Sequence, residues 1–388
     1  MAIGIEGFNG RRLTEVREAR GLTITALVER LEDDVSVASI SQYEKGISTP
    51  RPQIAEQLAT ALDVPISLFF KPQEEKTPEH LYWRSLASAT KLARTRAKRK
   101  YDWLKEISDY LHQYLEFPEP KLPEVRAPGD TGPMLPDQIE DAAQACRRFW
   151  GLGNEPIANI VSLIENSGVV VTRSPIDSDR LDAFSCFSSD KRTPFIFLGE
   201  DKNSAARSRL DCGHELGHLV LHRDVPAEMF SHTATHKRLE TEAFEFGMAF
   251  LFPRSAFLRE FHYPTLETFL KLKQKWNVSI AALIRRADKL GCLTGNQPRN
   301  LWINYTRRGW KKREPLDGMI EPETPRMLRS GLELLIEQGI RSRSEVLNDL
   351  CLSSLDIENI CGLPSGYLRD ERPKIQIRPV PLGHLQEE

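Results

Sequence analysis

The residues best suited to chemistry in this 388-residue sequence are His214, Glu215 and His218, within the segment Cys-Gly-His-Glu-Leu-Gly-His. The surrounding pattern is helical, and on a helix residues four apart lie one turn apart on the same face. Two imidazoles placed in this way can bind one zinc ion. Glu215 lies at the edge of the same site, where it can take a proton from a zinc-activated water and return it to a leaving amine. The segment therefore predicts a hydrolytic zinc site rather than an ordinary helix with two surface histidines.

A catalytic zinc needs a third protein ligand and one open position. We expect Glu240, at the start of the next predicted helix, to be that ligand, although it could also be a solvated helix-terminal carboxylate. Its rivals are Glu242, His232 and His236, because five of the nine histidines fall between 214 and 236. His222 lies one turn beyond the second histidine, and we expect it to pack or to support a ligand.

Composition and charge argue against several other classes of protein. The formal net charge is −2, so any nucleic-acid or membrane partner must be met by a local patch. The six cysteines are scattered without a close pair, which argues against a disulfide framework or a thiolate zinc site. The sequence shows neither a secretory signal nor an apolar run long enough to cross a membrane. We therefore expect a cytoplasmic protein without a membrane partner.

Turn signals and apolar periodicity divide the chain into a helical first part, an irregular middle and a mixed second part. Residues 8–70 fit five short helices, with Thr23 and Ser36 as N-caps of two of them. One or two longer helices are expected from about His80 to Glu116, followed by a proline-rich linker or crossing strap. Beyond it, helices are predicted over 137–150, 156–167, 204–222 and 239–252, and strands over 168–172, 182–187 and 194–198.

The segment around the two histidines resembles the ImmA/IrrE metallopeptidases. The resemblance covers about residues 137–255 and is carried by the run 212–222 followed by Glu240, Ala243, Phe246, Leu251 and Pro253. It implies that the two histidines and Glu240 bind zinc and that Glu215 is the general base. Two residues depart from the family pattern: Phe244 stands where Asn is common, and Cys212 stands where a small residue such as Ala is usual.

The first part of the chain resembles the XRE (Cro-like) helix-turn-helix family. This resemblance is carried by Leu22, Thr23 and Leu27, the run 40–46, Pro50, and the stretch 58–65. It implies that the second helix of the motif enters the major groove of double-stranded DNA, with its N-terminal residues foremost. By position, the residues expected to face bases are Val37, Ala38, Ser41 and Gln42, and Ser36 is expected to face a phosphate.

Charge gives only weak support to DNA binding. Residues 1–70 hold seven Lys or Arg and ten Asp or Glu, a net of −3, which supplies little affinity through counterion release. The run 91–100 adds six basic residues, which either contact phosphate or lie solvated on a connecting helix. Protein recognition or dimerisation is the alternative role for the first domain.

Together these features predict an α+β, mostly helical protein with four parts. They are a five-helix lambda-repressor-like helix-turn-helix domain (1–72), a helical connector and proline-rich linker (73–136), a zincin-like metallopeptidase domain with a small sheet (137–262), and a helical C-terminal region with an irregular tail (263–388). The expected function is DNA-binding regulation combined with zinc-dependent cleavage of a repressor, which is the protein itself or a partner. XRE modules often act as dimers, so a homodimer on a palindromic operator is a further expectation. The alternative is a transcription factor whose zincin-like domain is a non-hydrolytic sensor or structural module.

Overall fold

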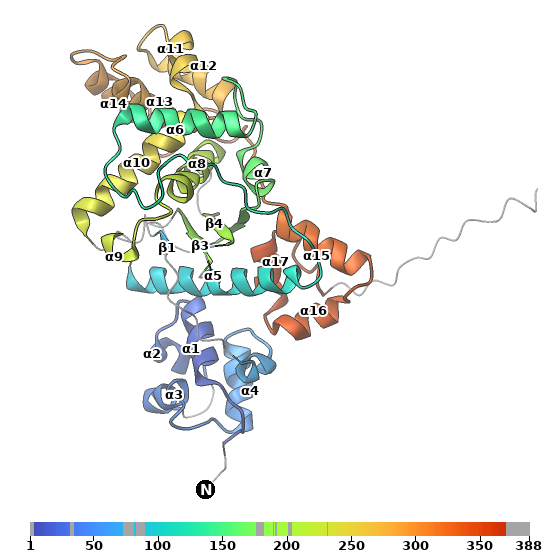
Figure 1. The fold of residues 1–388 in the computed structure, drawn as a ribbon. Helices are drawn as coiled ribbons and strands as arrows, with labels where there is room; N and C mark the ends of the chain where they lie inside the picture. Colours follow the sequence, from blue (N-terminus) through green and yellow to red (C-terminus); the bar gives the residue numbers. More distant parts are fainter. Residues whose placement is uncertain are drawn as a thin grey trace, which may run out of the picture.

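The computed structural model describes residues 4–31, 35–72, 81–82, 90–175, 182–188, 190, 192–200, 204–230 and 232–369. A small helical bundle forms one end of the molecule, and the long helix α5 (Lys91–His112) crosses between this bundle and a small sheet (Figure 1). Further helices cover the other face of the sheet, and a last helical group lies beside α5 and the bundle (Figure 1).

The N-terminal bundle has the predicted helix-turn-helix arrangement. The side chain of Thr23 accepts a hydrogen bond from the amide of Ala26, and that of Ser36 accepts one from the amide of Ser39, so both predicted N-caps are confirmed. The fifth predicted helix is a short 3-10 helix, η1. The elements are α1 (Gly10–Ala19), α2 (Ile24–Val28), α3 (Val37–Glu44), α4 (Pro52–Ala61) and η1 (Ile66–Phe70).

The basic run at the start of α5 is partly used to hold the molecule together. Arg99 donates to the Glu18 carboxylate at 2.8 Å, Arg96 donates to the carbonyl of Arg20 at 3.2 Å, and Lys100 donates to the carbonyl of Pro175. The side chains of Lys91, Arg94 and Lys98 are exposed. The run is therefore neither a fully solvated helix nor a continuous phosphate-binding surface.

A four-stranded sheet lies between α5 and the second set of helices, in the order β1-β3-β4-β2. β2 and β4 are parallel, whereas β3 pairs antiparallel with both β4 and β1. Both faces of the sheet are covered, which explains why β3 and β4 read as nearly continuous apolar runs. The two-residue strand β1 was not predicted. The strands are β1 (Leu81–Tyr82), β2 (Val170–Ser174), β3 (Ala183–Phe187) and β4 (Pro194–Gly199).

The second half of the chain is helical, and its predicted helices are present with shifted ends. The helix that carries Glu240 begins at Thr233, six residues before the predicted start at Leu239, so Glu240 lies in its second turn. Residues 233–238 are mostly polar, and His232 makes no side-chain cap, so the pattern gave no start signal there. The helices are α6 (Pro136–Phe149), α7 (Ile160–Glu165), α8 (Ala205–Leu221), α9 (Ala227–Phe230), α10 (Thr233–Leu251), α11 (Arg254–Glu260), α12 (Leu266–Trp276), α13 (Ile280–Lys289), α14 (Gln297–Arg307), α15 (Met327–Glu337), α16 (Arg343–Leu350) and α17 (Ser354–Cys361).

Two hydrophobic cores lie on opposite faces of the sheet. One core joins the N-terminal bundle, α5, the sheet residues Phe184 and Phe197, and the helices α15 to α17. The other joins the sheet residues Ile196 and Leu198 to α6, α7, α8 and α10 to α14. The predicted fold class, α+β and mostly helical with a small sheet, is confirmed. The domain limits given above stay a prediction.

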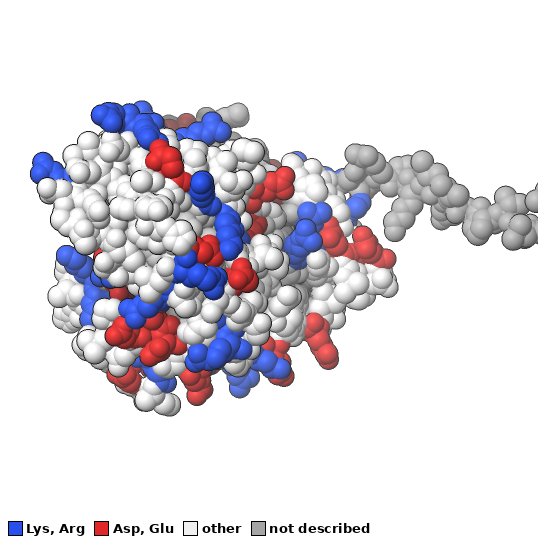
Figure 2. Space-filling model, turned by 90° about the horizontal axis from the view of Figure 1, so that it is seen from above, with Lys and Arg blue, Asp and Glu red and all other residues white. Residues whose placement is uncertain are grey.

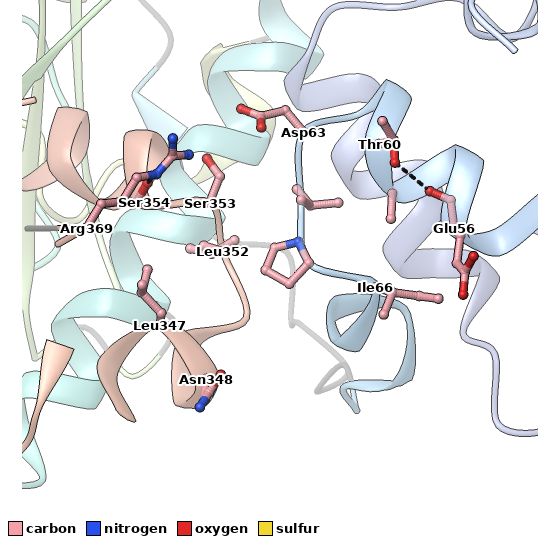
Figure 3. A pocket seen from close by; sticks show the side chains of 13 residues that line it. Glu56, Thr60, Asp63, Ile66, Leu347, Asn348, Leu352, Ser353, Ser354 and Arg369 are labelled. Carbon is pink, nitrogen blue, oxygen red and sulfur yellow. Dashed lines mark hydrogen bonds between the residues drawn. The ribbon is translucent and has the colours of Figure 1, made fainter. Parts of the chain in front are cut away.

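Where the N-terminal bundle meets the last helices, a pocket of about 540 Å³ remains open (Figure 3). Thr60, Asp63 and Ile66 line it from the bundle, while Leu347 and Arg369 line it from the C-terminal side. The N-terminal bundle and the C-terminal helices therefore do not pack against each other over the whole of the surface that they share.

On the face opposite the helix-turn-helix bundle, basic and acidic side chains are interspersed beside a broad uncharged area (Figure 2). This agrees with the formal net charge of −2. Among the described residues, no helix combines the length and the apolar character that crossing a membrane requires.

Candidate metal centre

The two histidines of the motif, His214 and His218, lie on one face of α8, and their Nε2 atoms face each other. Their Nε2 atoms are 2.9 Å apart, and both side chains are fully buried. The helix that carries them begins at the N-cap Ser204, whose side chain accepts from the amide of Arg207. The predicted four-residue spacing therefore brings two imidazole nitrogens together in the protein interior.

Glu240, from the adjacent helix α10, completes a three-residue group. Its carboxylate oxygens lie 3.8 Å from the Nε2 of His214 and 3.4 Å from the Nε2 of His218. Ligand atoms about 2 Å from a tetrahedral zinc ion are about 3.3 Å from one another, so the three separations fit such a site. The Glu240 side chain is 17% exposed, whereas neither imidazole is exposed.

The rival third ligands occupy other places. Glu242 points to His222, with 3.1 Å between its Oε2 and the histidine Nε2. His232 is exposed at the N-cap of α10. His236 lies one turn before Glu240, with its Nε2 3.9 Å from the Glu240 carboxylate. Among the described residues, only His214, His218 and Glu240 form a group able to hold a metal ion.

Glu215, the predicted general base, is 1% exposed and lies against strand β3. The hydroxyl of Ser185 donates to its Oε2 at 2.7 Å, which fixes the orientation of the carboxylate. Sequence reasoning did not identify Ser185. The only signal for it was a hydroxyl residue within the otherwise apolar strand Ala183–Phe187.

A second set of polar side chains contacts the Nδ1 atom of His218, the ring nitrogen that does not face the proposed metal position. The Nδ1 atoms of His218 and His222 are 3.0 Å apart, and His222 then contacts Glu242. Burial lowers the pKa of His222 to about 4, although its hydrogen bond with Glu242 acts in the opposite direction. For Glu242, burial would raise the pKa, but hydrogen bonds from His222, the amide of Met134 and Arg238 lower it below its usual value.

The two residues that depart from the family pattern lie on the same two helices as the cluster, Cys212 on α8 and Phe244 on α10. Phe244 packs partly buried against the second core, with the Arg285 guanidinium 5.6 Å from its ring centre. It therefore supplies no hydrogen bond of the kind an Asn would give at that position. Cys212 is fully buried, and burial raises the pKa of its thiol to about 12. All six cysteines are free thiols, as expected for a chain without a disulfide framework.

The residues predicted to face DNA lie at the start and along one side of α3. Val37, Ala38 and Gln42 are exposed, and Ser41 is half-buried. Ser36 is exposed too, and its side chain caps the helix. On the opposite side, Ile40 is fully buried and anchors α3 in the bundle. The geometry thus leaves this side of α3 accessible to a partner.

Comparison with known protein families finds two domains in this chain. Residues 10–68 match the family model of a helix-turn-helix domain, which spans α1 to η1. Residues 164–288 match that of the IrrE N-terminal-like domain (peptidase M78), which spans the sheet strands β2 to β4 and the helices α8 to α13. A comparison with curated proteins finds no match. The chain therefore carries a helix-turn-helix domain fused to a domain of the ImmA/IrrE peptidase family.

Proposed function

We propose that this protein is a DNA-binding transcriptional regulator whose ImmA/IrrE-type domain is a zinc-dependent endopeptidase that cleaves a repressor, itself or a partner. The observation that carries the proposal is the convergence of His214, His218 and Glu240, together with the buried carboxylate of Glu215 on the same helix as the two histidines. A regulator with a peptidase-family domain already follows from the two matched domains. The hydrolytic activity, the metal and the substrate are the proposed parts.

The donor set favours zinc. Two imidazoles and one carboxylate are the ligands of one well-known class of catalytic zinc site, which leaves a fourth position open. The partial exposure of Glu240 supports this arrangement, because a substrate can approach from that side. When bound, the ion would polarise a peptide carbonyl and lower the pKa of a water molecule to about 7.

The protein's own residues would handle the proton. Glu215 is placed to take a proton from the attacking water and to deliver it to the nitrogen of the leaving amine. Ser185 holds the carboxylate from the β3 side through its 2.7 Å hydrogen bond.

The DNA half of the proposal is supported by the helix-turn-helix match and by the exposed side of α3. We propose that Val37, Ala38, Ser41 and Gln42 face bases, that Ser36 faces a phosphate, and that the protein acts in the cytoplasm. A homodimer would read a palindromic operator with two copies of α3.

The peptidase half is tested with Glu215→Gln, compared with wild type and His214→Ala. Zinc content is measured by mass spectrometry on purified protein, and cleavage is measured on a proteome-derived peptide library and on the chain itself. We expect Glu215→Gln to keep its zinc and to lose cleavage by about 10²- to 10⁴-fold, because only proton transfer is removed. His214→Ala should lose both the metal and cleavage.

The control is Glu267→Gln, the same substitution at an exposed position of α12, which should change neither measurement. Full cleavage by Glu215→Gln would show that Glu215 is not the base. A wild type that binds zinc but cleaves neither the library nor itself would favour the non-hydrolytic sensor.

A further inference from the structure

A chain of three buried side chains leads from the proposed metal position into the protein. It runs from His218 through His222 to Glu242. The contacts are 3.0 Å between the Nδ1 atoms of the two histidines and 3.1 Å from the Nε2 of His222 to the carboxylate. Together with His214, these two histidines follow one face of α8 at four-residue intervals, and none of the three side chains is exposed.

The far end of this chain can only accept hydrogen bonds. The Oε1 of Glu242 accepts from the amide of Met134 at 3.1 Å and from Arg238 at 3.0 Å, an environment that holds the carboxylate ionised. Its other oxygen, Oε2, faces the Nε2 of His222, so that nitrogen must carry the proton.

The direction of the hydrogen bond between His222 and His218 then follows. A neutral imidazole donates from one nitrogen and accepts at the other, so His222 must accept at Nδ1. The nitrogen opposite it is the Nδ1 of His218, which must therefore be the donor. With its proton on Nδ1, His218 offers a lone pair at Nε2, and this atom lies 3.4 Å from the Glu240 carboxylate.

We propose that His222 and Glu242 are positioning residues that fix His218 in the tautomer able to bind a metal through Nε2. The proposal rests on the metal site proposed above. A metal-binding histidine commonly donates its second nitrogen directly to a carboxylate or a carbonyl. In this protein the imidazole of His222 lies between His218 and the carboxylate of Glu242. The carboxylate on α10 therefore orients the imidazole of His218 on α8 through His222.

The isosteric variant Glu242→Gln tests this directly. The amide oxygen is expected to stay where Met134 and Arg238 donate, so the amide NH2 takes the place of Oε2 and donates to His222. The two hydrogen bonds that join His218, His222 and residue 242 would both reverse, and the proton of His218 would move to Nε2, where it blocks metal binding. Zinc affinity, measured by competition with a chromophoric chelator, should fall by about 10- to 100-fold.

A second measurement reads the tautomer without any metal. In zinc-free protein labelled with ¹⁵N-histidine, NMR chemical shifts should show His218 protonated at Nδ1 in wild type and at Nε2 in Glu242→Gln. The matched control is Glu245→Gln on the same helix, whose carboxylate pairs with Lys289 on α13. It should change neither the tautomer nor the affinity.

His222→Gln provides the conservative comparison, because its amide oxygen can accept from His218 while its NH2 donates to Glu242. It should keep most of the affinity, whereas His222→Leu should lose it as Glu242→Gln does. An unchanged zinc affinity in Glu242→Gln, or a wild-type His218 protonated at Nε2, would overturn the proposal. A wild type that takes up no zinc would instead refute the metal site, since the NMR measurement tests the hydrogen-bond chain independently.

Discussion

Gln42 is the residue of α3 with the clearest means of reading a base. Its side chain is exposed on the helix side opposite the buried Ile40. A glutamine amide can donate to and accept from one adenine in the major groove, whereas Val37 and Ala38 can only contact a thymine methyl.

We therefore expect Gln42→Ala to weaken binding to the preferred operator and to relax specificity at one base pair. The preferred sequence is first selected from random duplexes with the wild-type protein, and affinities are then compared at one salt concentration. The loss should be about 1–3 kcal/mol on the preferred sequence and much less on unrelated DNA. Gln113→Ala, at the exposed end of α5, is the control. An equal loss on all sequences would assign Gln42 to the phosphate backbone instead.

At the residue scale, the pairing of His214 with His218 could be predicted because it depends only on their spacing along one helix. Two histidines four apart on a helix need no tertiary structure to share a face. The need for a third ligand left four candidates, among which Glu240 was favoured by its position and by the family resemblance. Ser185 and the pairing of His222 with Glu242 could not be predicted in the same way. Each depends on how two elements approach one another, and no spacing along the chain encodes that approach.

At the scale of elements, the site depends on the close crossing of α8 and α10. A Cβ added to Gly247 on α10 would lie 2.9 Å from the amide nitrogen of His214 and 3.0 Å from the carbonyl carbon of Gly213. Both contacts are with backbone, which cannot rotate away. The distance between Glu240 and the histidines is therefore set by the absence of a side chain at Gly247.

Gly247→Ala should push the two helices apart, with a loss of about 1–3 kcal/mol in folding free energy and a weaker zinc affinity. Gly213→Ala is the matched control at the same crossing, because its Cβ would meet its nearest neighbours at ordinary distances of 3.4–3.7 Å. That variant should be neutral, or more stable by up to about 1 kcal/mol through helix propensity. Chemical denaturation of zinc-free protein and chelator competition measure the two effects. Equal behaviour of both variants would contradict this account.

The helices and strands of the peptidase-family domain were largely predictable, but their ends and edges were not. The polar residues 233–238 gave no apolar period, so the first six residues of α10 were missed. The strand β1 has only two residues, too few for a period of two to be visible. The basic run on α5 read as a surface feature because the partners of Arg99 and Lys100 lie far away in sequence.

At the scale of the whole molecule, the DNA-binding bundle is bound to the C-terminal helices as well as to α5. Arg20 at the end of α1 donates to both oxygens of Asp356 on α17, at 2.7 and 2.6 Å. Burial would lower the pKa of Arg20, but the hydrogen bonds and charge of Asp356 raise it above its ordinary value. The pair therefore stabilises the docking of two segments that are 336 residues apart in sequence.

We expect Asp356→Asn to loosen this docking by about 1–3 kcal/mol, because a half-buried guanidinium loses its counter-charge. Hydrogen exchange followed by mass spectrometry should show faster exchange in peptides from α1, α4 and α17 together. Asp109→Asn is the control, since its pair with Lys105 is exposed and such pairs contribute about 0–1 kcal/mol. Faster exchange confined to α17 would mean that the bundle is held by α5 alone.

The shared core has a consequence for any regulation by cleavage. The N-terminal bundle, α5, one face of the sheet and the helices α15 to α17 bury their side chains in one cluster. A single backbone cut between residues 72 and 90 would break the chain and leave that cluster intact. The two fragments would separate in a denaturing gel but would co-elute in size-exclusion chromatography. Release of a cut DNA-binding fragment would therefore also require exposure of the apolar surface that it shares with the rest of the molecule.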